Sequence, residues 1–481
     1  MTSEREPGLS RRQYLQAAGV GVVSLAGIGT AQAAGGDEIW RFETGKAVGT
    51  SATVVDGTVF VGSRDNNVYA LDASDGTEQW RRFLPGNTSG SPTVVDGTVF
   101  VGSGGYNNVY ALDASDGTER WAFQTGSSVS SSPTVVDGTV FIGSKDNNVY
   151  ALDASDGTEQ WRFETGDMVD SSATMVDGAV FIGSRDNNVY ALDASDGTER
   201  WRFETGRNVK SSATVVDGTV FVGSYDNNVY ALDAGDGTEQ WRFQTGAYVD
   251  SSPTAVDGTV FVGSGDNNVY ALDADDGTEQ WHFRTGALVV SSPTAVDGTV
   301  FVGSWDGNVY ALDADDGTEQ WAFQTGNAVS NSPTVVDGTV FVGSGDGNVY
   351  ALEAGVSGSS EGSRVMLGTL GHHGDWRYAG QNIDRQTATG STTTDPTATE
   401  PPTTGPATTD PTATEPPTTD PTTTGSVTTT DPSDSGLQDT PEETSATDGS
   451  GGLPGFGIAA GIVGIGTGLG LKQYLEDDVE E

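Results

Sequence analysis

Short apolar runs separated by polar turn residues follow one another along most of the chain. Four runs recur in one order, namely "SATVV", "TVFVG", "NVYALD" and "EQWRFET". They are rich in Val, Tyr, Phe and Trp, which are enriched in β-strands. The intervening "DG", "DNN" and "DASDG" contain Asp, Asn and Gly, which tolerate the positive φ of tight hairpin turns. Apolar residues at helical spacing are absent, so the pattern predicts consecutive antiparallel strands.

The four runs repeat as one unit. The Trp residue of the last run marks the period, because successive copies lie 40 residues apart and once 41. The additional residue falls in "GSGGYNN" (102–108), a turn in which an insertion is tolerated. The repeated tryptophans are Trp40, Trp80, Trp121, Trp161, Trp201, Trp241, Trp281 and Trp321. Four antiparallel strands in a unit of this length predict a β-propeller.

The number of units predicts how the ring closes. "VYAL" occurs eight times, first at Val68 and last at Val349. The last copy has no Trp run after it, and the first Trp run (38–44) has no unit before it. We therefore predict an all-β fold over 37–354, an eight-bladed β-propeller of four-stranded blades. The N-terminal strand closes the last blade, which pairs two edges that would otherwise invite aggregation.

The segments that flank the propeller differ from it in composition. Residues 1–34 contain a twin arginine, Arg11 and Arg12, then a weakly apolar run and an Ala-rich end. This order is typical of a twin-arginine signal peptide, which directs the export of folded proteins. Residues 386–452 are mostly Thr, Pro, Asp, Glu and Ser, and predict a disordered, O-glycosylated stalk because they have little apolar surface to bury. A post-propeller segment, 355–385, precedes this stalk.

The C-terminal segment, 453–481, combines an apolar run with an acidic tail. Pro454, Gly455 and Phe456 begin this run and resemble the sorting signal that archaeosortases recognise, which implies cleavage and attachment to lipid. A basic cluster normally follows the apolar run of such signals, whereas here Lys472 stands alone. A plain membrane anchor would give the same location. Both interpretations predict an exported protein that is held at the cell surface.

Charge restricts the partners of the protein. The chain has 22 Lys and Arg against 68 Asp and Glu, a formal net charge of −46, and no Cys. A surface this acidic repels nucleic acids. Without Cys there is no disulfide, thiolate nucleophile or thiolate metal ligand. The acid-rich, lysine-poor composition is typical of adaptation to high salt, where charges are screened over a few ångströms, and predicts a halophilic archaeal source.

The stretch "ALDASDGTEQW" (70–80) resembles the tryptophan-docking motif of the quinoprotein, or PQQ-like, propeller family. The motif residues are Ala70, Asp72, Gly76 and Trp80. The resemblance extends over about 37–354. It implies that each Trp packs between the Ala of its own blade and the Gly-containing turn of a neighbouring blade. The repeated tryptophans are therefore interpreted as structural.

Enzymes of that family bind pyrroloquinoline quinone and calcium at the centre of the ring, through residues that differ from blade to blade. The strands expected there are near copies of "SSPTVVDG", and no Cys can form the vicinal disulfide found in many of these enzymes. The chain therefore resembles the non-catalytic members, such as the BamB-type lipoproteins, more than the dehydrogenases. We expect no cofactor and no catalytic residue. The role of BamB does not carry over directly, because an archaeal envelope has no outer membrane.

Two clusters in the sequence contain residue types that can ligate a metal ion. The acidic turn 273–277 has its glycine one position early for an EF-hand, which favours a solvated hairpin turn. His372, His373 and Asp375 offer two imidazoles and one carboxylate, but no further ligand lies nearby in the sequence. A surface loop is the favoured interpretation, and we predict no metal site.

Comparison of the repeats with one another shows two stretches that vary. One follows "GS" at the turn between the second and third strands, and the other is the loop after "TG" that leads to the next blade. Because strands alternate in direction, both stretches lie on one face of the disc, which we call the variable face. The constant "VDG" and "ASDG" turns lie on the opposite, acidic face. Specificity is expected on the variable face.

Large and basic side chains on the variable face gather by blade. The basic sector comprises Lys145, Arg185, Arg207 and Lys210, and the aromatic and apolar sector comprises Tyr225, Tyr248, Leu288 and Trp305. Exposed aromatics beside Arg are typical anchors of protein interfaces, and aromatic rings also stack on sugars. Drift at tolerant turn positions is the alternative explanation. Asn87 begins the single N-glycosylation sequon, on the same face.

The sequence thus predicts an exported, surface-anchored propeller. It would act as a non-enzymatic binding or assembly scaffold for an envelope protein or glycan, attached to the membrane through its C-terminal anchor. Two other functions remain open, a PQQ-dependent dehydrogenase and a purely structural surface protein.

Overall fold

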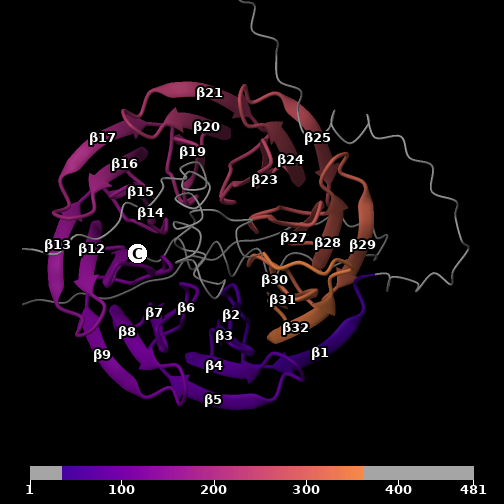
Figure 1. The fold of residues 1–481 in the computed structure, drawn as a ribbon, viewed down its shortest axis with the longest axis horizontal. Coiled ribbons are helices and arrows are strands. Elements are labelled where there is room, and N and C mark those ends of the chain that lie inside the picture. The colour runs from indigo at the N-terminus through magenta and orange to yellow at the C-terminus, as the bar shows by residue number, and fades with distance from the viewer. Residues whose placement is uncertain (1–34, 361–481) are drawn as a thin grey trace, which may run out of the picture. The chain divides into compact units, whose positions relative to one another are not determined.

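The computed structural model describes residues 35–360. Their strands form eight four-stranded sheets arranged as blades around an axis (Figure 1). Residues 35–360 contain no helix, and none of the described residues therefore forms a helix that could span a membrane. The predicted eight-bladed all-β fold is confirmed. The twin arginine, His372 and His373, the stalk and the sorting signal lie outside the described residues.

Each blade has the same strand order from the axis to the rim. The innermost strands of blades 1 to 8 are β2 (Thr53–Val55), β6 (Thr93–Val95), β10 (Thr134–Val136), β14 (Thr174–Val176), β18 (Thr214–Val216), β22 (Thr254–Val256), β26 (Thr294–Val296) and β30 (Thr334–Val336). The second strands are β3 (Thr58–Gly62), β7 (Thr98–Gly102), β11 (Thr139–Gly143), β15 (Ala179–Gly183), β19 (Thr219–Gly223), β23 (Thr259–Gly263), β27 (Thr299–Gly303) and β31 (Thr339–Gly343).

The third strands are β4 (Asn67–Asp72), β8 (Asn108–Asp113), β12 (Asn148–Asp153), β16 (Asn188–Asp193), β20 (Asn228–Asp233), β24 (Asn268–Asp273), β28 (Asn308–Asp313) and β32 (Asn348–Glu353). The outermost strands are β5 (Glu78–Phe83), β9 (Glu119–Gln124), β13 (Glu159–Glu164), β17 (Glu199–Glu204), β21 (Glu239–Gln244), β25 (Glu279–Arg284), β29 (Glu319–Gln324) and β1 (Glu38–Glu43). All pairings within a blade are antiparallel, as the hairpin turns require.

The ring closes through its N-terminal strand. β1 pairs with β32, with Trp40 opposite Ala351 and Phe42 opposite Val349, and so completes blade 8 (Figure 1). The side chain of Asn331, which replaces a serine of the repeat, donates hydrogen bonds to the carbonyls of Val48 (2.9 Å) and Thr50 (2.7 Å). Closure therefore has both a strand pairing and a side-chain contact across the ends of the ring.

Each tryptophan docks one blade on the next. The indole of Trp201, 8% exposed, donates to the carbonyl of Ala234 at 3.0 Å, and its backbone pairs with Ala191 of the same blade. A Cβ atom on Gly237 would lie 2.6 Å from Cε3 of Trp201, so only glycine allows the turn to lie this close. Equivalent indole bonds join Trp40 to Ala73, Trp80 to Ala114, Trp121 to Ala154, Trp161 to Ala194, Trp241 to Ala274, Trp281 to Ala314 and Trp321 to Ala354.

The motif residues of blade 1 occupy the positions that this docking contact requires. Ala70 is fully buried and pairs with Trp80. The Asp72 carboxylate accepts from Ser74 N at 2.9 Å and so shapes the turn, and Gly76 packs against Trp40 of blade 8. Trp321 lacks a glycine turn of this kind and packs on Gly36 instead, because the N-terminal segment completes that blade.

Candidate functional site

The innermost strands join neighbouring blades through two closed belts of hydrogen bonds. In the first belt a threonine hydroxyl donates to a carbonyl of the next blade. The pairs are Thr53 to Pro92, Thr93 to Pro133, Thr134 to Ala173, Thr174 to Ala213, Thr214 to Pro253, Thr254 to Pro293, Thr294 to Pro333 and Thr334 to Ala52. The last pair joins blade 8 to blade 1, so the belt has no end.

The second belt runs through serines. A backbone N–H of each blade donates to a serine hydroxyl of the next, in the order Ser51, Ser91, Ser132, Ser172, Ser212, Ser252, Ser292, Ser332 and back to Ser51. Every blade contributes the same groups. The region around the axis is therefore chemically uniform and engaged in holding the ring together.

These residues do not fit a calcium-bound quinone. Calcium takes roughly six to eight oxygen ligands, several of them carboxylates. The threonine and serine hydroxyls of the innermost strands are already bonded between blades. Among residues 35–360, no three or more His, Cys, Asp or Glu side chains are grouped so that they could hold a metal ion.

The two variable stretches meet on one face, as their bonding shows. The backbone N–H of the residue after "GS" donates to a carbonyl of the loop that leads into the same blade. Arg185 N donates to Met168 and Tyr225 N donates to Asn208, both at 2.9 Å. In blade 2 this position belongs to Gly104, not to Tyr106, because the N–H of Gly104 donates to Asn87. Asn87 thus lies on the variable face.

A constant carboxylate supports each variable turn. Asp226 accepts from Tyr230 Oη at 2.6 Å, from Gly206 N at 2.7 Å and from Asn228 N at 3.0 Å. Burial alone would raise the pKa of Asp226, but these hydrogen bonds outweigh it and lower the pKa. Burial and the Asp226 carboxylate together raise the pKa of Tyr230 to about 12. Equivalent Tyr–Asp bonds occur in every blade except blade 2.

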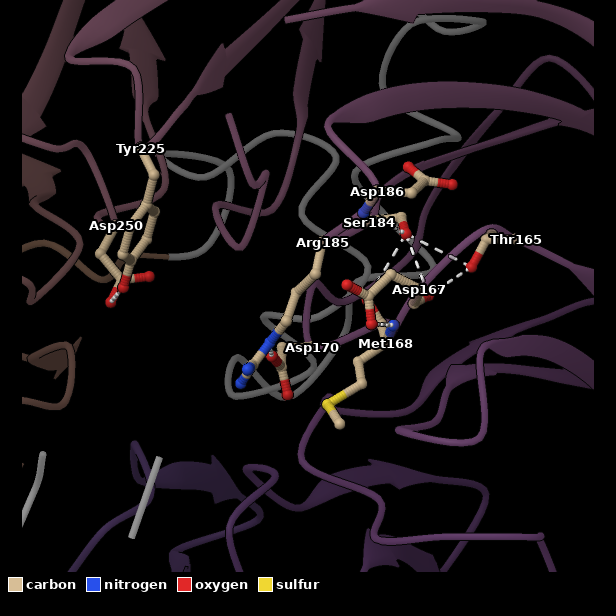
Figure 2. A network of polar contacts seen from close by, with 9 residues as sticks. All are labelled: Thr165, Asp167, Met168, Asp170, Ser184, Arg185, Asp186, Tyr225 and Asp250. Atoms are coloured by element: carbon tan, nitrogen blue, oxygen red, sulfur yellow. Dashed lines mark hydrogen bonds and ion pairs between the residues drawn. The ribbon is translucent and has the colours of Figure 1, made fainter. Parts of the chain in front are cut away.

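The basic sector is partly neutralised within the propeller. Arg185 Nε lies 2.5 Å from Asp170 Oδ2, and the two side chains are only 15% and 12% exposed (Figure 2). Asp170 comes from the loop that leads into the same blade. Arg185, predicted as part of the basic sector, is therefore engaged within the propeller. Lys145 and Lys210 are half-buried, and only Arg207 is exposed.

The loop that carries Asp170 is held by its own polar network. Ser184 Oγ donates to Thr165 Oγ1 at 3.3 Å and to the carbonyl of Asp167 at 3.1 Å, as Figure 2 shows. Thr165 Oγ1 donates to the same carbonyl at 2.6 Å. Corresponding Ser and Thr residues recur in other blades, for example Ser224 and Thr205. A constant scaffold therefore positions the variable side chains.

Two residues of the aromatic sector form a stack between blade 5 and the loop into blade 6. Tyr225 of blade 5 and Tyr248 of the loop into blade 6 lie with ring centroids 4.8 Å apart and planes 17° apart. Lys210 Nζ lies 5.0 Å from the centroid of Tyr225, a cation–π distance. Tyr225 Oη donates to Asp250 at 3.0 Å (Figure 2), and Gly265 packs against Tyr248. Residues at the variable positions thus contact one another.

The remaining residues of the aromatic sector, Leu288 and Trp305, belong to blade 7 and the loop that leads into it. Trp305 and Leu288 are joined by a backbone bond of 3.0 Å, from the Trp305 N–H to the Leu288 carbonyl. Both side chains are half-buried, as are Tyr225 and Tyr248. The aromatic sector is therefore less exposed than expected. The exposed large hydrophobic side chains of residues 35–360 are instead Ile39, Phe83 and Tyr106.

These features define a closed eight-bladed propeller with tryptophan-docked blades, uniform at its axis and varied on one face. Residues 26–106 and 96–176 match the family described as outer membrane protein assembly factor BamB. Residues 137–361 match the beta-propeller described for the beta-alanine-activating enzyme. The repeats are therefore similar to those of both propeller families. No curated protein sequence matches the chain.

Known structures resemble this propeller in fold. BamB from Moraxella catarrhalis is 20% identical with a TM-score of 0.59, covering 66% of this chain and 99% of its own. The computationally designed Ika8 protein is 17% identical with a TM-score of 0.61, covering 66% and 100%. A quinohemoprotein alcohol dehydrogenase from Comamonas testosteroni is 17% identical with a TM-score of 0.56, covering 66% and 76%. At these identities the likeness shows the fold alone.

Proposed function

We propose that this protein is an exported, cell-surface-anchored scaffold that binds an envelope protein or glycan through the variable face of its propeller, without enzymatic activity. The similarity of its repeats to those of an outer membrane protein assembly factor supports a role in protein interaction. The N-terminal leader and the C-terminal apolar run support attachment to the envelope.

The observation that carries this proposal is the network of contacts among the variable side chains of blade 5 and the loop into blade 6. Seven of the eight blades keep the same Tyr–Asp turn, and all blades share the axial belts, yet Lys210, Tyr225, Tyr248 and Asp250 form one stack found in a single sector. In this sector an aromatic stack, a cation–π contact and a hydrogen bond together hold the variable side chains in fixed positions. A rigid, asymmetric surface on an otherwise uniform ring is what recognition of one partner requires.

Capture from envelope extract tests the proposal. The full-length wild type and the variant Trp305→Ala with Tyr225→Ala are immobilised in molar salt and exposed to solubilised envelope. The matched control, Asp236→Asn with Asp276→Asn, alters exposed residues of the acidic face. We expect the same bound species for wild type and control, and at least a tenfold loss for the variable-face variant. Equal capture by all three would refute the proposal.

A quinone dehydrogenase is the second candidate, because dehydrogenases of that class share the fold. It predicts that pyrroloquinoline quinone with calcium quenches tryptophan fluorescence in a saturable way near one equivalent, and that electrons pass from an alcohol to a dye. The scaffold proposal predicts a flat titration, because the hydroxyls around the axis are bonded between blades.

A further inference from the structure

The junction of blades 1 and 2 departs from the repeat in three places at once. In β5 the apolar position shifts by one residue, because Arg82 stands opposite Val68 where Phe163 of blade 3 stands opposite Val149. Phe83 consequently occupies an outward position that is Gln or Glu in most blades. The turn 103–107 carries an inserted residue, and the loop before it carries the sequon at Asn87.

The loop and the turn are in contact, which brings these departures together. Gly104 N donates to the carbonyl of Asn87 at 2.9 Å, and Ser103 Oγ donates to the carbonyl of Pro85 at 2.7 Å. A Cβ atom on Gly86 would overlap the backbone of Gly105, so the two segments approach as closely as glycine permits. Asn87 follows Gly86 directly, and Tyr106 follows Gly105 directly.

Two aromatic residues close to Asn87 in the loop and in the contacting turn are exposed to solvent. Phe83 is 60% exposed and Tyr106 is 64% exposed, and they are the two most exposed large hydrophobic residues of 35–360. Phe83 and Asn87 are four positions apart in the chain, so their Cα atoms are at most about 14 Å apart. A short chain of sugars linked to Asn87 can therefore reach Phe83. Tyr106 lies only two residues after Gly104, whose N–H donates to the Asn87 carbonyl, and is within the same reach.

We propose that Asn87 carries an N-linked glycan whose first sugars pack on Phe83 and Tyr106. The apolar C–H faces of a sugar ring cover an aromatic ring and remove it from water, which is favourable in proportion to the apolar area buried. Asn87 is exposed, and within residues 35–360 no hydrogen bond engages its side-chain amide. The glycan of this chain, rather than a second protein, is the occupant that a sequon next to these exposed rings favours.

The predicted twin-arginine route exports a folded protein, so the acceptor asparagine must be accessible in the folded state. A folded protein can be modified only at an acceptor that is accessible in its folded state. Asn87 lies in an exposed loop, whereas the neighbouring Thr88 is buried and bridges to Ser103. The loop is therefore anchored on one side and open at the asparagine. This inference rests on the export that is part of the proposed function, but it does not depend on partner binding by the variable face.

Footprinting of the full-length protein tests the inference. Wild type, Ser89→Ala and Asn87→Gln are purified from cells that export the chain, and the peptide containing Asn87 is analysed by mass spectrometry. Hydroxyl-radical labelling then measures the accessibility of Phe83 and Tyr106. We expect a glycan on wild type only, and labelling of both rings several-fold slower in wild type than in the two variants. Ile39, 46% exposed on β1, is the internal control and should label equally in all three.

Three results would overturn the inference: an unmodified Asn87, equal labelling of the rings in all three proteins, or protection that persists in Ser89→Ala, which would indicate another occupant. If neither variant folds, removal of the glycan from the wild type replaces them. A second readout uses Phe83→Gln with Tyr106→Ser, since Gln124 occupies the position of Phe83 in blade 2. This variant should keep the glycan but lose the increase in melting temperature that the glycan gives the wild type.

Discussion

Two glycines of blade 5 allow the tryptophan-docking contact to be measured in isolation. Gly237 and Gly218 both have left-handed backbone, with φ of 74° and 79°. A Cβ atom on Gly237 would lie 2.6 Å from the indole of Trp201, whereas a Cβ atom on Gly218 would have nothing within 4 Å. Alanine at either position therefore strains the backbone equally, and only Gly237→Ala also displaces the indole.

The expected difference follows from these contacts. Left-handed backbone costs an alanine about 1–2 kcal/mol, a term that both variants share. Overpacking against Trp201 costs about 1–3 kcal/mol more, and weakening of the bond between the indole and the Ala234 carbonyl adds about 1 kcal/mol. Gly237→Ala should therefore lower the free energy of unfolding by about 2–4 kcal/mol more than Gly218→Ala.

Chemical denaturation in molar salt, followed by tryptophan fluorescence and circular dichroism, measures this difference. The account predicts a clearly lower midpoint for Gly237→Ala and a small shift for Gly218→Ala. Equal midpoints would show that the turn glycines serve only backbone conformation. The repeated tryptophans would then not be the contact that holds the blades together.

Four further predictions concern single contacts. Arg185→Ala should destabilise the fold by about 2 kcal/mol, because it removes the cation that pairs with Asp170. A double-mutant cycle with Asp170→Ala should show coupling between the two positions. Because the folded-state pKa of Asp226 is lowered, its stabilisation is present above about pH 4 and lost as pH falls, so Asp226→Asn should flatten the acid limb of a stability–pH profile. Because the pKa of Tyr230 is raised to about 12, neutral Tyr230 stabilises the fold fully below about pH 10 and progressively less as pH rises to 12, which alkaline titration of its absorbance can follow. Asn331→Ser should loosen ring closure by about 1–2 kcal/mol, and hydrogen exchange should increase in β1 and β32 and not in the strands of blade 4.

The architecture was predictable because each blade repeats the same local signals. Every blade has the same apolar runs and the same Asx-Gly turns, and the unpaired Trp run at the N-terminus could only complete the last blade. Such agreement between local preference and global fold leaves few alternative topologies. The eight "VYAL" copies were therefore enough to predict eight sheets and the pairing of β1 with β32.

The site was predictable only in part, because it depends on contacts between side chains of different repeats. Alternation of strand direction placed Tyr225 and Tyr248 on one face, but nothing in the sequence indicated that they stack. The sequence did not indicate the pairing of Arg185 with Asp170, although both are variable positions of opposite charge. The shift that exposes Phe83 was visible in "WRRFLPG", which departs from "WRFETG" by one position.

The proposed role of the variable face is tested most directly by site-specific photo-crosslinking on whole cells. A photoreactive residue replaces Arg207 on the variable face or Asp236 on the acidic face, both exposed and both belonging to blade 5 or its adjoining loop. The account predicts that position 207 forms one dominant adduct with an envelope component in molar salt and that position 236 forms none. Equal crosslinking from both positions, or none from position 207, would contradict a binding role for the variable face.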